Sequence, residues 1–141
     1  MAILSFKLNK VSGEKKEKSS KKVSVKANSA IESVKKAKSD NIGDYLHVNF
    51  KYEVRYEPDV GEITLEGSLW FAHPNLKDMV SDSGKDKLQL KGEAVQEIST
   101  SIVRESLVES LDIARKLRLP LPINLPTVEI KAKTVDFKKA A

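Results

Sequence analysis

LHVNFKYEVRYE, residues 46–57, is the stretch that decides the fold. An apolar side chain occupies every even position and a polar or charged side chain every odd position. Because successive side chains of a strand point to opposite faces, this alternation predicts a long strand with one dry face and one wet face. A Pro-Asp-Val-Gly turn follows, and residues 62–71 then alternate in the same way. The two runs predict an antiparallel hairpin.

Two weaker alternations precede the hairpin, at residues 3–11 and 23–36. We expect both to be strands, although residues 31–36 also suit a helical turn. The polar, lysine-rich residues between them predict an exposed connection, and polar residues 73–91 predict a loop. The pattern as a whole predicts four strands and one long helix, in a single domain over residues 1–141.

That helix is predicted over residues 92–118. Its apolar residues spread over roughly 220° of the helical wheel, whereas one sheet face covers about half of such an arc. We therefore expect a second copy of the chain to cover the remainder, in a dimer or a tetramer. The side chains expected at this oligomer interface are Ile98, Ile102, Leu107 and Leu111.

LPLPINLP, residues 119–126, follows the helix directly. Its three prolines remove three backbone donors and restrict φ, so we expect residues 119–130 to run extended. The segment is apolar, so it either seals a neighbouring surface or offers one to a partner, and both alternatives stay open. Residues 131–141 are expected to form a polar tail.

The chain has 141 residues, no cysteine and a net charge of +5. No apolar run approaches the roughly 20 residues that span a bilayer, so we expect no membrane insertion and a cytoplasmic location. Residues 7–38 hold eleven lysines against three glutamates, but residues 7–44 hold no arginine or aromatic residue. This favours a solubilising segment, with a nucleic-acid-associated accessory protein as the alternative. The polyanion contact would then use Lys15, Lys16, Lys21 and Lys22.

Catalytic signatures are missing from the sequence. His47 and His73 are the two histidines, and no carboxylate stands at metal-ligand spacing beside either. No phosphate-binding glycine loop or nucleophile elbow occurs. We therefore expect no enzyme, no metal and no cofactor. Trp70 falls on the wet face of its strand, which makes it the candidate for an exposed aromatic contact with a client.

The order of elements and residues 119–130 resemble the SecB family of export chaperones, whose members carry a similar Phe-Pro, Asn-Leu, Pro-Val pattern after their long helix. The chain departs from the family at residues 92–97, where a cysteine- and proline-bearing motif is absent, and at residues 131–141, where no lid helix is expected. Bacterial members dock a basic ATPase through carboxylates on the sheet. The basic first connection here argues against that docking.

The resemblance implies an ATP-independent chaperone or peptide-binding protein that holds unfolded polypeptides in apolar grooves. It implies an α+β fold, a twisted four-stranded antiparallel sheet packed by one long helix, and a homo-oligomer joined through edge strands and that helix. A purely structural assembly protein is the remaining alternative. The side chains that the resemblance assigns to the client groove are Leu121, Ile123, Leu125 and Val128.

Overall fold

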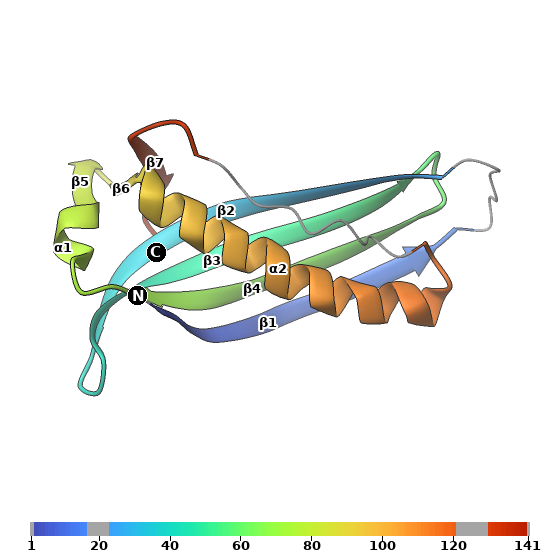
Figure 1. The fold of residues 1–141 in the computed structure, drawn as a ribbon, viewed down its shortest axis with the longest axis horizontal. Helices are drawn as coiled ribbons and strands as arrows, with labels where there is room; N and C mark the ends of the chain where they lie inside the picture. The colour runs from blue at the N-terminus through green and yellow to red at the C-terminus, as the bar shows by residue number, and fades with distance from the viewer. Residues whose placement is uncertain (1, 17–22, 121–129, 141) are drawn as a thin grey trace.

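A computed structural model describes residues 2–16, 23–120 and 130–140. Its main feature is a four-stranded antiparallel sheet in the order β1-β4-β3-β2 (Figure 1). The strands run over Ala2–Lys15 (β1), Ser24–Ser39 (β2), Gly43–Glu57 (β3) and Gly61–Ala72 (β4). All four expected strands are confirmed, each longer than its apolar alternation. Residues 31–36 are strand, so the alternative of a helical turn is wrong.

The hairpin of β3 and β4 has the alternation that the sequence predicts. Leu46 lies opposite Phe71, and Val54 lies opposite Ile63. Because opposed residues point to the same side, the even residues of β3 and the odd residues of β4 form one apolar face. The long helix α2, Gly92–Leu117, lies diagonally across this face and contacts all four strands (Figure 1). We call this the helix side of the sheet and the opposite face the outer face.

The helix ends at Arg118, which adopts a left-handed conformation with φ 55°. The backbone N–H of Leu119 then donates to the Ala114 carbonyl oxygen at 2.8 Å. This bond satisfies one of the carbonyl groups that the end of a helix leaves free. No described helix has the length and apolar character needed to cross a membrane.

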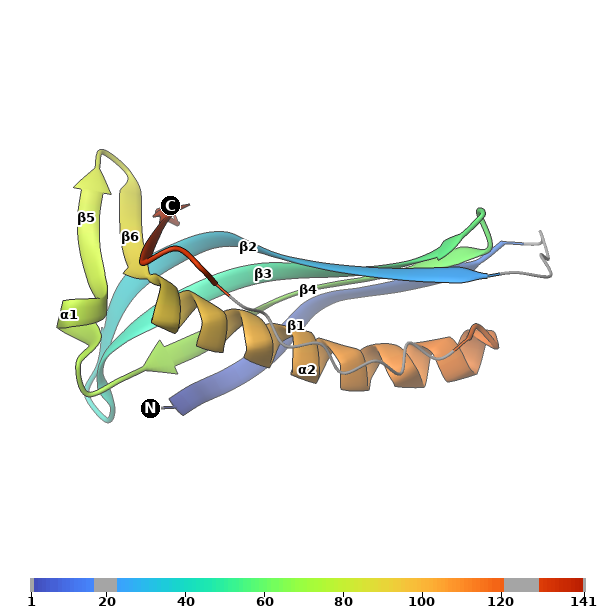
Figure 2. The same ribbon diagram turned by 45° about the horizontal axis from the view of Figure 1, so that its top comes forward.

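A second, three-stranded sheet stands at the end of the main sheet where α2 begins (Figure 2). Its strands are Val80–Gly84 (β5), Lys87–Lys91 (β6) and Thr134–Lys138 (β7), and the short helix α1, Leu76–Met79, precedes it. The predicted loop over residues 73–91 is therefore wrong, and the polar tail expected over residues 131–141 contains the strand β7. Each element is too short to give a periodic signal, and β6 pairs with a strand more than forty residues away.

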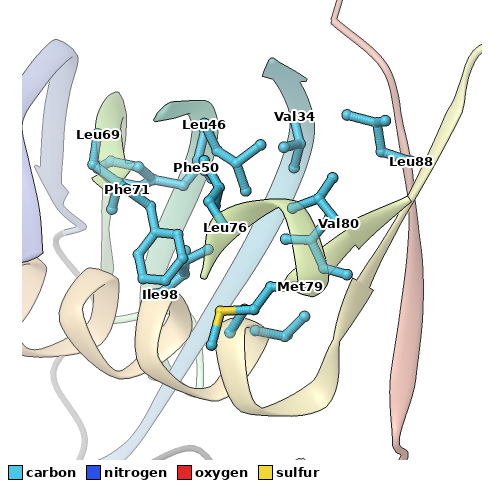
Figure 3. Close-up of a cluster of buried hydrophobic side chains, with 14 of the residues drawn as sticks. Val34, Leu46, Phe50, Leu69, Phe71, Leu76, Met79, Val80, Leu88 and Ile98 are labelled. Atoms are coloured by element: carbon cyan, nitrogen blue, oxygen red, sulfur yellow. The ribbon is translucent and has the colours of Figure 1, made fainter. Parts of the chain in front are cut away.

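The second sheet forms because its few apolar residues complete the main core. Leu76, Met79, Val80 and Leu88 pack with Leu46 and Phe71 beneath the first half of α2 (Figure 3). A second apolar cluster lies under the other half of the helix and includes Tyr52, Tyr56, Ile63 and Leu119. We call the end of the sheet where α2 begins the proximal end and the end where α2 stops the distal end.

Candidate functional site

The four residues expected in the client groove, Leu121, Ile123, Leu125 and Val128, lie outside the described residues. Their described neighbours in sequence lie on the helix side, at opposite ends of α2. Leu119 is 5% exposed and approaches Gly61 at the distal end. Ile130 is half-buried and approaches Gly92 at the proximal end.

The residues expected at the oligomer interface are mostly covered by the chain itself. Ile98, Ile102 and Leu107 are 0%, 1% and 2% exposed. The structure corrects the prediction here, because the chain's own sheet covers these side chains and a second copy has no access to them. Leu111 is half-buried and remains accessible. The helical wheel overestimated the uncovered arc because the sheet twists and α2 crosses it diagonally, so strand residues reach further around the helix.

Two large apolar side chains do remain open, one on α2 and one on the edge strand β1. Val108 of α2 is 62% exposed and Val11 of β1 is 53% exposed. Gly13, two residues further along β1, approaches Ile113 and Leu117 of the helix. At about 100° per residue, Val108 and Leu111 lie on the other side of α2 from Ile113 and Leu117, so Val11 and Val108 are separate exposed side chains. Sequence periodicity placed Leu111 on the apolar arc, but only the packing shows which apolar residues stay open.

An apolar strip lies on the β2 edge of the sheet. Val25, Ala27 and Ile31 of β2 point to the helix side, opposite Tyr56, Val54 and Phe50. Val25 is 37% exposed, Ala27 is exposed and Ile31 is half-buried. We call these three residues the β2 strip.

The outer backbone edge of β2 beside this strip has no partner strand among the described residues. The C-terminal residues reach β2 at Val34, whose carbonyl oxygen accepts a hydrogen bond from the N–H of Ala140 at 3.0 Å. Along residues 24–33, no described segment pairs with the outer edge of the strand. An open edge beside an open apolar strip is an arrangement that accepts an extended peptide as an additional strand.

Trp70 lies on the opposite face. It faces Leu4 and His47 across the strands and stacks on Tyr45, with ring centroids 4.5 Å apart. It is half-buried. The structure therefore does not bring Trp70 together with Leu119 and Ile130, the described neighbours of the other residues expected to contact clients.

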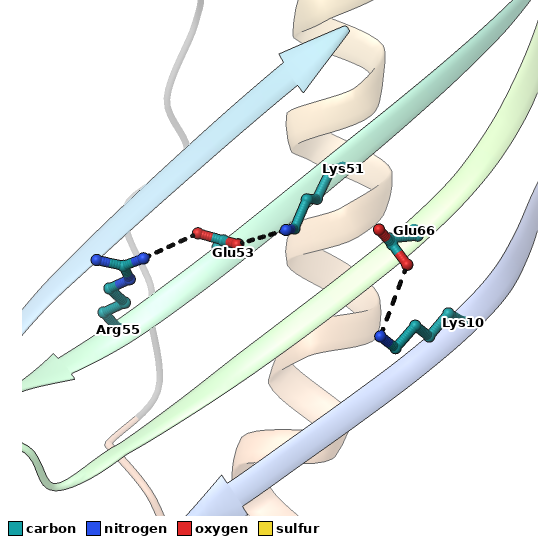
Figure 4. A network of polar contacts seen from close by, with 5 residues as sticks. All are labelled: Lys10, Lys51, Glu53, Arg55 and Glu66. Atoms are coloured by element: carbon teal, nitrogen blue, oxygen red, sulfur yellow. Dashed lines mark hydrogen bonds and ion pairs between the residues drawn. The ribbon is translucent and has the colours of Figure 1, made fainter. Parts of the chain in front are cut away.

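The distal half of the outer face is covered with ion pairs (Figure 4). Glu53 contacts Lys51 at 3.0 Å and Arg55 at 3.5 Å, and Glu66 contacts Lys10 at 3.9 Å. The hydrogen bond from Lys51 lowers the pKa of Glu53. Each of these two carboxylates is therefore paired with at least one cation.

The lysines expected to contact a polyanion are only partly described, since Lys21 and Lys22 lie outside the described residues. Lys15 is exposed. Lys16 forms an ion pair with Asp59 at 2.6 Å, and the hydrogen bond to Asp59 raises the lysine pKa. An ammonium group that is already paired contributes less to phosphate neutralisation.

No group of three or more potential metal ligands occurs among the described residues. The two histidines do not approach a shared partner in this part of the chain. His47 lies on the outer face beside Trp70, and the Nδ1 atom of His73 accepts a hydrogen bond from the Asn75 backbone N–H at 2.9 Å. The described surface offers the β2 strip, the exposed valines of β1 and α2, and an aromatic cluster.

In comparisons with known proteins, no family model and no curated protein matches the chain. The architecture is that of a SecB-like fold, as the sequence resemblance implied. It is similar to the solved structure of the Mycobacterium tuberculosis Rv1957 SecB-like chaperone in complex with a ChAD peptide from the Rv1956 HigA1 antitoxin. The match has a TM-score of 0.51 and 16% sequence identity, and it covers 93% of this chain and 87% of that chain. At this identity the likeness establishes the fold.

Proposed function

We propose that this protein is an ATP-independent chaperone or peptide-binding protein that holds extended, apolar segments of unfolded polypeptides. The observation that carries the proposal is the β2 strip, which combines exposed apolar side chains with an open strand edge. The similarity to a SecB-like chaperone described with a bound peptide supports it. Holding a peptide requires a surface of this kind and no reactive side chains. The β2 strip therefore favours a binding protein over an enzyme.

A client would bind as an additional strand along residues 24–33. Main-chain hydrogen bonds to β2 do not depend on the client sequence, so they permit many clients. Every second client side chain would pack on Val25, Ala27 and Ile31. At about 25 cal/mol per Å² of buried apolar surface, a few such contacts give weak and reversible holding.

We propose that Leu121, Ile123, Leu125 and Val128 add to the same client surface. Their described neighbours Leu119 and Ile130 lie on the helix side, where the β2 strip also faces. Trp70 is not part of this surface, because it lies on the outer face.

The experiment compares two single substitutions of equally exposed residues. Val25→Glu places a charge on the β2 strip, whereas Ile42→Glu places one in the β2–β3 turn, where the isoleucine is 39% exposed. We expect Val25→Glu to weaken binding of a labelled unfolded polypeptide by about tenfold and to reduce aggregation suppression. Ile42→Glu should leave both unchanged. Equal affinities of the two variants, with circular dichroism showing both folded, would overturn the proposal.

We also propose that the exposed Val11 of β1 and Val108 of α2 lie in contacts between copies of the chain. Val11 and Val108 are the two most exposed large apolar side chains among the described residues. Light scattering should show an oligomer that Val108→Glu dissociates and Ile42→Glu does not. A protein that is oligomeric but suppresses no aggregation would instead be a structural assembly protein.

A further inference from the structure

The proximal half of the outer face differs from its distal half in composition. One row across the sheet consists of Leu4, Trp70, His47 and Lys35, which lie opposite one another on β1, β4, β3 and β2. Tyr45 stacks on Trp70, and Lys7 lies in the next row beside Ser68. A sheet face that points away from its helix is usually polar, so a contiguous aromatic and aliphatic cluster here needs a reason. We call Leu4, Lys7, Lys35, Tyr45, His47 and Trp70 the outer patch.

The charge of the outer patch is unbalanced. Lys7 and Lys35 are exposed and form no ion pair among the described residues. The remaining cations of the outer face are all paired, because Lys10, Lys26, Lys51 and Arg55 each contact a glutamate. No acidic residue occurs in the row of Trp70 or in the row of Lys7, Ser68, Asn49 and Ser33.

Trp70 also has an unused polar group. Its indole N–H donates to no described residue. The N–H of a tryptophan that is at least partly buried usually has a hydrogen-bond partner. The ring is half-buried by Tyr45 and its strand neighbours, which holds it in place at little further entropic cost. A fixed aromatic ring with a free donor is a typical anchor point of a protein interface.

The chemistry of the outer patch selects one kind of partner. The two free lysines attract carboxylates, and the Leu4–Trp70–Tyr45 surface accepts an apolar side chain. The row spans three strand spacings, about 14 Å, which matches roughly four residues of extended chain. Single-stranded nucleic acid fits less well, since Tyr45 and Trp70 cover each other's ring faces and the patch has no arginine.

We propose that the outer patch docks a short acidic peptide segment of a partner protein, with carboxylates on Lys7 and Lys35 and one aromatic or aliphatic side chain on Trp70. This surface is separate from the proposed client surface, which lies on the helix side of the sheet. The charges of this proposed contact are the reverse of those in bacterial members of the SecB family, which dock a basic ATPase through carboxylates on the sheet.

Trp70 is the single tryptophan of the chain, so its fluorescence reports directly on the outer patch. The probe is a short tryptophan-free peptide of aspartate and glutamate residues around a central Leu-Phe pair. We expect saturable quenching or a shift of the Trp70 emission that weakens as salt increases, because exposed charges are screened. A basic peptide with the same Leu-Phe pair should produce no change.

Charge reversal provides the matched test. Lys35→Glu should weaken binding of the acidic peptide by about tenfold or more. Lys26→Glu, on the same strand but ion-paired with Glu57 at 3.3 Å and far from the outer patch, should leave the affinity unchanged. Trp70→Phe keeps an aromatic ring, so anisotropy with a labelled peptide should show weakened but retained binding, whereas Trp70→Ala abolishes it.

Three results would overturn this proposal. The first is that the acidic peptide causes no change in Trp70 emission. The second is that an oligothymidine gives the same saturable change and loses it in Lys35→Glu, which would assign the patch to single-stranded nucleic acid. The third is that Val25→Glu abolishes binding of the acidic peptide, which would assign the peptide to the client surface. If Val25→Glu binds the acidic peptide normally but also binds unfolded clients normally, the proposed function fails and the outer patch stands.

Discussion

The layer of side chains between α2 and the sheet differs in composition between its proximal and distal ends. At the proximal end, branched aliphatic and aromatic side chains such as Leu46, Phe71 and Ile98 fill the space, and the second sheet closes it (Figure 3). At the distal end, Tyr52 and Tyr56 meet a helix face that carries Ser106 and Ser110. The hydroxyls of Tyr56 and Ser106 are buried without a hydrogen-bond partner among the described residues.

This difference in composition affects how strongly each end of α2 is attached to the sheet. The Ser110 hydroxyl, which faces Tyr52, donates to the Leu107 carbonyl oxygen of its own helix at 2.8 Å. Buried polar groups without partners cost free energy, whereas buried aliphatic groups contribute it. We infer that the proximal end carries most of the stability and that the distal end, next to Val25 of the β2 strip, opens more readily.

The largest expected effect is at the proximal end. Ile98→Ala removes a side chain that is 0% exposed and leaves a cavity, so we expect a loss of ~2–5 kcal/mol in the free energy of unfolding. Val108→Ala, on the exposed side of the same helix, should change it by less than about 0.5 kcal/mol in the monomeric protein. Urea denaturation followed by circular dichroism measures both. Similar losses in the two variants would show that α2 does not pack as described.

The next largest loss of stability is expected from replacing a glycine at the proximal end, with a glycine at the distal end as the comparison. A Cβ at Gly92 would meet the backbone carbonyl of Ala132, which cannot move aside cheaply, so Gly92→Ala should cost about 2 kcal/mol. A Cβ at Gly13 would meet the side-chain ends of Ile113 at 2.8 Å and Leu117 at 2.9 Å. Because these can shift, Gly13→Ala should cost about 1 kcal/mol or less. Denaturation midpoints in the reverse order would contradict the proposed difference between the ends.

A smaller effect, of opposite sign, is expected from the distal hydroxyls. Ser106→Ala removes a buried hydroxyl without a partner and improves helix propensity, so stability should rise by about 0.5–1 kcal/mol. Ser101→Ala changes a half-buried serine of the same helix and controls for helix propensity. If Ser106→Ala is destabilised, an ordered water or another group satisfies that hydroxyl.

The smallest effect appears only at alkaline pH. Burial raises the pKa of Tyr56 to about 12, and the neighbouring Tyr52 adds to the shift. Below pH 10 the phenol is neutral in both states and has no effect. Above the unfolded pKa of about 10, the unfolded state loses its proton first, so stability falls with rising pH and levels off beyond the folded pKa. Tyr56→Phe should show a shallower decline between pH 10 and 12, and superimposable curves would refute the assignment.

The sequence predicted the four-stranded sheet and α2 because their apolar periodicity extends over many residues. Residues 46–57 alternate without exception, and the structure has β3 over Gly43–Glu57. The second sheet was missed because Leu88 and Leu90 alone give β6 no recognisable period, and its partner Val135 is distant in sequence. Trp70 was correctly placed on the wet face by its position, but its neighbours Tyr45 and Lys35 lie on other strands, so alternation alone could not reveal the outer patch.

The sequence by itself determined which residues point to each face of the sheet, because side-chain direction in a strand depends only on position along the chain. It also determined that α2 is long and amphipathic, since helical periodicity is local. Only the tertiary structure decided which apolar residues remain open. Val108, Val11 and Val25 are exposed while Ile98 and Ile102 are buried, and the difference comes from the diagonal path of α2 over a sheet four strands wide. That path results from packing between residues far apart in sequence, which no local pattern records.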